Sequence, residues 1–137
     1  MAWRGWNTGS NRKYGNKKVE IDGETFDSLK EARRGKELEM LEQAGAIRGL
    51  QRQVRFELIP TIREPETVGK RGGIKPGKVI ERGVEYIADF VYQDAETGET
   101  VVEDVKGYRD TNSAAYKIFV LKRKLMLHIY KVRVKEI

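Results

Sequence analysis

Hydrophobic and polar residues begin to alternate in the segment "KKVEIDGETFDS", around Asp22 and Gly23. An Asp-Gly pair between two alternating runs is a typical β-hairpin signal. The next segment, "SLKEARRGKELEMLEQAG", has Leu38 and Leu41 at helical spacing, so we predict a helix whose apolar stripe runs through them. Gly35 in its interior costs roughly 1 kcal/mol relative to alanine, and it would allow another backbone to approach closely.

The rest of the chain predicts four strands and a second helix. Alternating runs predict strands in "QRQVRFELIP", "GVEYIADFVYQD", "TVVEDVKG" and "YKVRVKEI". The turn "AETGET" joins the second and third of these strands as a hairpin. A helix capped by Asn112 or Ser113 is predicted in "TNSAAYKIFVLKRKLMLH", and residues 63–83 are predicted to be a long polar, glycine-rich connection. This mixed order indicates an α/β fold with helices on the faces of a sheet.

Composition adds a domain count. With 137 residues, 39% hydrophobic and 35% charged, the chain fits one globular domain over residues 17–137. Residues 1–16 mix basic residues with Trp3, Trp6 and Tyr14, which predicts a flexible arm whose aromatic rings either stack on bases or cap an apolar patch. We expect no membrane span and no signal peptide, since no run of about 18 apolar residues occurs.

The residue types also limit the chemistry. The chain has no cysteine, so no disulfide or thiolate metal site is possible, and His128 is the only histidine. Any metal would be held by carboxylates, which favours Mg²⁺ or Mn²⁺. The net charge of +6 favours a polyanionic partner such as nucleic acid or an anionic membrane surface.

Candidate chemistry centres on charged residues within two predicted strands. Asp104 and Lys106 in "VVEDVKG" point to the same face of their strand, and Asp89 interrupts the apolar run "YIADFVY". If the two strands pair, Asp89 and Asp104 lie close together, where a divalent cation would relieve their repulsion and Lys106 could act on a phosphate. The alternatives are a buried ion pair or a solvated strand edge. Glu103 points to the opposite face as a supporting or surface residue, or replaces Asp104 if the register differs.

Glu31 is a further acidic candidate. It falls close to Leu38 around the first helix, on the side that should face the sheet, where a carboxylate is costly without a partner. One interpretation makes Glu31 a third acid at the metal. The other makes it the third-position acid of a capping box that begins at Ser28.

These motifs together resemble the PD-(D/E)XK nuclease superfamily, the restriction-endonuclease-like fold. That family's core runs helix, three strands, helix, strand, with an acid on the second strand, D/E-x-K on the third and often a glutamate on the first helix. The chain departs from the pattern in that Ala88 stands before Asp89 in place of proline. More narrowly, "KYGNKKVEIDGETFDSLKEA", "YIADFVY" and "VVEDVKG" resemble small phage and prophage proteins described as endonucleases, as Holliday-junction resolvases or as of unknown function.

The resemblance implies a restriction-endonuclease-like core preceded by a small β-hairpin, and a metal-dependent DNA endonuclease in the cytoplasm of a bacterial host. It implies catalytic roles for Glu31, Asp89, Asp104 and Lys106. It also implies a Mg²⁺ site, open to Mn²⁺, formed by Asp89, Asp104, the Val105 carbonyl and Glu31. The preferred substrate would be branched DNA such as a Holliday junction.

Basic residues predict where DNA would be bound. The candidates for phosphate contact are Lys70, Arg71, Lys75, Lys78, Arg109 and Lys117. The second helix is apolar on two nearly opposite sides, one with Ile118, Leu121 and Leu125 and the other with Tyr116, Val120 and Leu127. This pattern favours either a homodimer or a helix placed between the sheet and the N-terminal arm. Two other functions stay open: a non-catalytic nucleic-acid-binding protein on the same fold, and a phage protein that binds a partner protein through this helix.

Overall fold

We describe the protein from a computed structural model that covers residues 18–21, 23–107 and 110–137. The N-terminal segment 1–16, Asp22 of the hairpin turn and Arg109 lie outside the described residues. The larger elements are helix α1 (Leu29–Gln43), strands β3 (Ile47–Ile59), β8 (Val84–Asp94) and β9 (Thr100–Asp104), helix α2 (Ala114–Tyr130) and strand β10 (Val134–Glu136). They are preceded by a hairpin of β1 (Val19–Ile21) and β2 (Glu24–Phe26), as predicted.

Strands β3, β8, β9 and β10 form one mixed sheet in the order β10-β9-β8-β3. Strand β8 pairs antiparallel with both β3 and β9, whereas β10 runs parallel to β9. Antiparallel neighbours can be joined by a short turn, but the parallel strand needs a crossover, and α2 supplies it. The predicted α/β class and the predicted hairpin between β8 and β9 are therefore confirmed.

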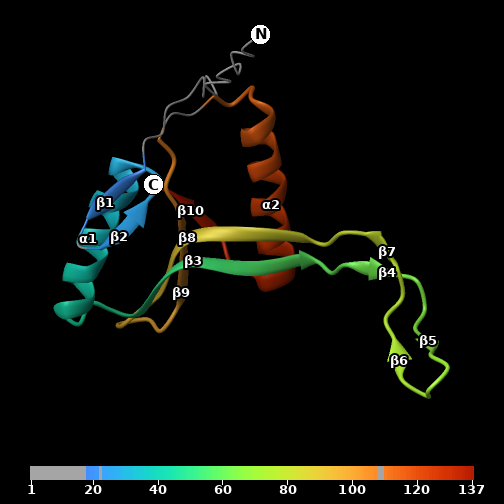
Figure 1. The fold of residues 1–137 in the computed structure, drawn as a ribbon. Helices are drawn as coiled ribbons and strands as arrows, with labels where there is room; N and C mark the ends of the chain where they lie inside the picture. Colours follow the sequence, from blue (N-terminus) through green and yellow to red (C-terminus); the bar gives the residue numbers. More distant parts are fainter. Residues whose placement is uncertain (1–17, 22, 108–109) are drawn as a thin grey trace, which may run out of the picture.

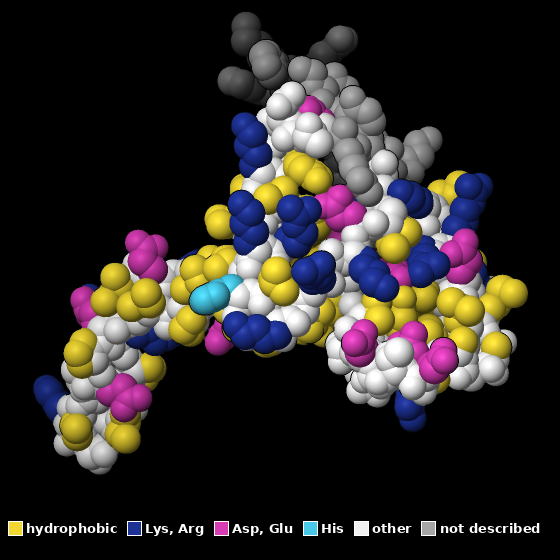
Figure 2. All heavy atoms as spheres, turned by 180° about the vertical axis from the view of Figure 1, so that it is seen from behind, with side chains coloured by type: hydrophobic (Ala, Val, Ile, Leu, Met, Phe, Trp, Pro, Cys, Tyr) yellow, Lys and Arg dark blue, Asp and Glu magenta, His cyan; other side chains and the backbone are white. Residues whose placement is uncertain are grey.

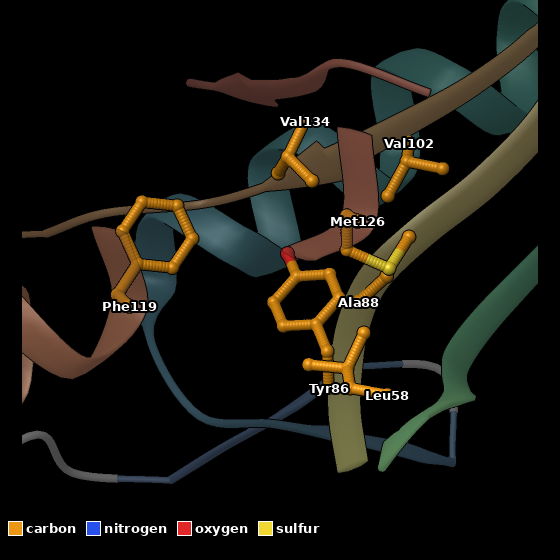
Figure 3. Close-up of a cluster of buried hydrophobic side chains, with 7 residues drawn as sticks. All are labelled: Leu58, Tyr86, Ala88, Val102, Phe119, Met126 and Val134. Carbon is orange, nitrogen blue, oxygen red and sulfur yellow. The ribbon is translucent and has the colours of Figure 1, made fainter. Parts of the chain in front are cut away.

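Two hydrophobic clusters hold the helices to the sheet, and Figure 1 shows α1 and α2 on either side of it. The cluster under α2 is drawn in Figure 3, where Phe119 and Met126 lie around Tyr86. The other cluster joins α1 and the hairpin to the sheet. It consists of Phe26, Ala32, Leu38, Ile47, Phe90 and Tyr92.

Helix α1 differs from its predicted packing in two respects. Leu38 is fully buried as expected, but Leu41 is 39% exposed, so the predicted apolar stripe through both leucines was wrong. Gly35 does admit a close neighbour, although the neighbour is not a backbone. A Cβ atom at Gly35 would lie 3.1 Å from Cε1 of Phe26 and 3.4 Å from Cζ of Phe90, so the missing side chain makes room for two aromatic rings.

The segment predicted to be a long connection is instead a narrow two-stranded ribbon. It contains β4 (Ile62–Arg63), β5 (Thr67–Val68), β6 (Ile74–Lys75) and β7 (Val79–Glu81). Strand β4 pairs with β7 and β5 pairs with β6, so the ribbon prolongs the β3–β8 hairpin. Residues 60–83, here called the arm, project from the body of the molecule in Figure 1.

Helix α2 buries a face that the sequence pattern did not identify. Phe119 and Met126 are its buried residues, and the two predicted apolar sides flank them. Ile118 and Leu121 are 54% and 58% exposed. These exposed residues are compatible with the homodimer, which stays a prediction. Within the described ranges, no helix is both long and apolar enough to cross a membrane.

Candidate active site

Asp89 lies in β8 opposite the end of β9. Phe90 pairs with Glu103, so the next position along the ladder brings Asp89 level with Asp104. Just beyond the end of β9, the main-chain N–H of Val105 donates a hydrogen bond of 2.7 Å to Oδ2 of Asp89. This bond fixes the carboxylate of one strand against the backbone of the other.

Asp104 has a partner for each carboxylate oxygen. The hydroxyl of Tyr86 donates to Oδ2 at 2.8 Å, and Nζ of Lys106 lies 2.8 Å from Oδ1. The ammonium group of Lys106 also lies 3.7 Å from the ring centroid of Phe119 on α2, in cation–π geometry. Lys30 holds the backbone at this point, because its Nζ donates to the main-chain oxygen of Lys106 at 2.7 Å. The D-x-K segment is thus held by the sheet and by both helices.

Glu31 lies at the start of α1 and also faces the sheet; its role at a metal stays a prediction. Its main-chain N–H donates to Oγ of the N-cap Ser28 at 3.1 Å, which is a helix-capping bond. Its Oε2 accepts from the N–H of Asp27 at 3.2 Å, one residue before the position expected for a capping box. Its Oε1 faces the sheet and accepts from Nε2 of Gln53 at 3.0 Å. The side chain is buried, so Glu31 both caps α1 and presents an oxygen to the site.

Gln53 connects Glu31 to Asp89 and was missed by the sequence analysis. Its Nε2 donates both to Oε1 of Glu31 and, at 3.2 Å, to Oδ1 of Asp89. Its φ angle of 50° lies in the left-handed region, which is rare for a residue other than glycine in a strand. Such a conformation costs of order 1–3 kcal/mol and clusters at functional sites. The backbone strain and the hydrogen bonds to Glu31 and Asp89 thus both point to Gln53 as part of the site.

Glu103 lies on the other face of β9 and is fully buried, so the surface interpretation was wrong. Arg34 of α1 donates to both of its oxygens, from Nε at 2.9 Å and from NH2 at 2.6 Å, and the hydroxyl of Tyr92 donates at 2.6 Å. Burial alone would raise the pKa of Glu103, but these donors outweigh it and the pKa is lowered. Both of its oxygens already accept hydrogen bonds from Arg34 or Tyr92. In the observed register Glu103 pairs with Phe90, so it does not replace Asp104 opposite Asp89.

Negative charge is in excess among the site residues. Burial, helped by the nearby charges of Asp104 and Glu31, raises the pKa of Asp89 to about 6 in spite of the lowering effect of the hydrogen bonds from the Val105 N–H and Gln53. The pKa of Glu31 is raised as well, chiefly by burial. Lys106 and Arg52, the latter with NH2 3.7 Å from Oε1 of Glu31, offset only part of this charge. Hard carboxylate oxygens that repel one another suit Mg²⁺ or Mn²⁺, so the donor set fits the implied metal. Within the described ranges, however, no three acidic or imidazole groups already converge at metal-binding distances.

The predicted phosphate-contacting residues fall in two places. Lys70, Arg71, Lys75 and Lys78 are exposed on the arm, and Lys117 is exposed near the start of α2. Figure 2 shows Lys and Arg side chains gathered over α2 on the back of the molecule, and the arm projecting away from it. The structure does not bring these cations into contact with the acidic residues. Their role in binding phosphate stays a prediction.

Residues 11–136 match the sequence profile of DUF1064, which is described as a protein of unknown function. The chain belongs to this family. No curated protein matches this DUF1064 chain. No solved structure matches it either.

The raised pKa of Asp89 predicts how the stability of the metal-free DUF1064 protein depends on pH. Folded Asp89 keeps its proton up to about pH 6, whereas an unfolded aspartate loses it near 3.8. The folded state therefore binds more protons in this interval, and the free energy of unfolding should fall as the pH rises from about 4 to about 6. Thermal melts in chelator should show this decrease, and Asp89→Asn should make it smaller. An equally large decrease in the variant would refute the assignment.

Proposed function

We propose that this DUF1064 protein is a metal-dependent DNA endonuclease with a restriction-endonuclease-like core. The observation that supports this proposal most strongly is the arrangement where β8 and β9 meet. There the Val105 N–H donates a hydrogen bond to Asp89, and Lys106 forms an ion pair with Asp104. The order of the larger elements, helix, three strands, helix, strand, agrees with such a core. An acid on the middle strand and D-x-K at the end of the next would supply carboxylates for a metal and a lysine for the phosphate, which suits metal-assisted phosphodiester hydrolysis.

Each side chain has a role in this proposal. Asp89, Asp104 and the Val105 carbonyl would hold Mg²⁺, with Glu31 contributing from α1. When bound, the metal would supply an activated water and neutralise charge on the phosphate. Lys106, held between Asp104 and the ring of Phe119, would orient the water or stabilise the negative charge that develops on the phosphate oxygens.

The other site residues would hold these groups in position. Tyr86 fixes the rotamer of Asp104, and its burial together with that carboxylate raises the pKa of the phenol, so the hydroxyl remains a donor. Gln53 ties Glu31 to Asp89 and spaces the two carboxylates. A carboxylate already held near its working geometry loses less freedom when a metal binds.

A second candidate function is a non-catalytic nucleic-acid-binding protein on the same fold. The observation that favours it is the absence, over the part of the chain that the structure describes, of three acidic groups converging at metal-binding distances. In that case the acids and Lys106 form a structural cluster of hydrogen bonds and ion pairs. The net charge of +6 serves either function.

Cleavage of a labelled four-way DNA junction and a linear duplex of the same sequence distinguishes the two functions. We expect the wild-type protein to cut in Mg²⁺ or Mn²⁺ and to be inactive in chelator, with the junction preferred. Asp89→Asn, purified in the same way, controls for contaminating nucleases and should not cut. Cutting of both substrates at equal rates would keep the nuclease and discard the preference for branched DNA. Binding without cleavage under any of these metals would favour the non-catalytic protein.

A further inference from the structure

The arm is an ordered β-ribbon and not an irregular loop. Its middle, between the β4–β7 and β5–β6 pairs, is held by backbone contacts. A Cβ atom at Gly77 would collide with the carbonyl oxygen of Glu64, and the N–H of Glu64 donates to the oxygen of Lys78 at 2.8 Å. At its tip, the N–H of Gly72 donates to the oxygen of Gly69 at 3.0 Å and closes a tight turn. The ribbon is therefore a defined two-stranded element that extends into solvent.

Positive charge is concentrated at the far end of this ribbon. Lys70 and Arg71 occupy the two central positions of the tip turn, so they lead the arm into solvent. Lys75 and Lys78 follow, and the segment 67–78 contains no acidic residue. Over the described residues, none of these four cations forms an ion pair with an acidic side chain.

Exposed aliphatic side chains accompany the cations. Val68 and Ile74 are directly opposite each other in the β5–β6 pair, and they are 76% and 70% exposed. An exposed cross-strand aliphatic pair offers an apolar contact to a ligand that reaches the ribbon. Figure 2 shows hydrophobic side chains along the arm beside the charged ones.

We propose that the arm is a DNA-contacting ribbon whose tip enters the major groove of duplex DNA beyond the cleavage site. The major groove admits a two-stranded β-ribbon, in which the basic turn would contact phosphates and the aliphatic pair would face base edges. Charge favours DNA over a second copy of this chain, because a tip with four unpaired cations would meet a protein of net charge +6. This inference rests on the proposed function in so far as DNA is the substrate.

Strand β8 carries Asp89 and is continuous with the arm, so the distance from Asp89 to the tip of the arm has an upper limit. The path from Asp89 to the tip follows β8 back to Val84, crosses to its partner Ile59 in β3, and continues along the arm to Lys70. At about 3.3 Å per residue, this path is at most roughly 50 Å long. This length corresponds to about 15 base pairs of duplex at about 3.4 Å each. Duplex DNA that continues up to this distance from the cleavage site should therefore gain affinity, and duplex beyond it should not.

The test measures binding separately from cleavage. Fluorescence anisotropy in chelator would use four-way junctions with duplex arms of about 8 or about 20 base pairs, shorter and longer than this reach. The wild-type protein should bind the longer junction at least about tenfold more tightly, and the quadruple variant K70A/R71A/K75A/K78A should bind both equally. The slope of log affinity against log salt should fall by about four in the variant. All four side chains are exposed, so the variant should fold normally.

Two acidic residues of the same arm provide a control for which the opposite change in affinity is expected. Removing the negative charges of Glu64 and Glu66 with glutamine should tighten binding to the longer junction. Unchanged affinity, length preference and salt slope in the quadruple variant would overturn the inference and leave the nuclease intact. Loss of self-association in place of DNA affinity would also overturn it, since the arm would then belong to a dimer interface. Arm-dependent binding by a protein that never cleaves would support the inference while the proposed function fails.

Discussion

Exchange of Asp104 for asparagine is expected to lower the rate of metal-dependent DNA cleavage by at least about a thousandfold. The substitution keeps the shape of the side chain, so the hydroxyl of Tyr86 still has an oxygen to which it can donate. It removes one of the charges that would hold Mg²⁺, and it deprives Lys106 of its ion-pair partner. Initial rates on a four-way junction at saturating protein would measure the loss of activity, and calorimetric titration with Mg²⁺ would measure the loss of metal affinity.

Glu96 provides the matched control for this experiment. It is exposed in the turn between β8 and β9, so Glu96→Gln removes a carboxylate from the same hairpin without touching the site. Its cleavage rate and its affinity for Mg²⁺ should equal those of the wild-type protein. If Asp104→Asn cleaved as fast as Glu96→Gln, the chemistry would have to lie elsewhere in the molecule.

The acidic centre could be predicted because it depends on local rules. Side chains alternate along a strand, and the short turn "AETGET" leaves few ways for β8 and β9 to pair. Together these rules bring Asp89 level with Asp104, and they put Glu103 on the opposite face. The identity and order of the central elements followed from the same periodicities.

Gln53 and Tyr86 could not be predicted, because their importance arises from contacts between distant segments. The run "QRQVRFEL" alternates like any half-exposed strand, and nothing in it signals that Gln53 adopts a positive φ angle. Tyr86 reaches Asp104 from another strand although it precedes Asp89 by an odd number of residues, so simple alternation would have put it on the wrong face.

The arm shows a different limit of sequence analysis. Its paired segments are very short and alternate with glycine and proline, so periodicity identifies no strand. Its structure comes instead from a continuation of the β3–β8 hairpin and from close backbone contacts that only glycine permits at Gly77. The long connection was correctly located, whereas its conformation depended on tertiary information.

Truncation of Glu103 to alanine is expected to destabilise the fold by about 3–5 kcal/mol while sparing the chemistry of the site. Glu103 is fully buried and receives two hydrogen bonds from Arg34 and one from the hydroxyl of Tyr92. Its removal leaves a largely buried guanidinium and a buried hydroxyl without their acceptor, and that desolvation penalty is the main source of the loss. Urea unfolding followed by circular dichroism would give the change in free energy of unfolding.

Glu37 offers a control that shares the same arginine. It pairs with NH1 of Arg34 at 2.9 Å, but its side chain is 63% exposed, so Glu37→Ala should cost less than about 1 kcal/mol. A large difference between the two variants would locate the stabilising interaction in the buried half of this network. At temperatures where Glu103→Ala remains folded, its affinity for Mg²⁺ should match that of the wild-type protein. If Glu103→Ala instead lost its affinity for Mg²⁺ with little loss of stability, Glu103 and not Asp104 would be the metal ligand of β9.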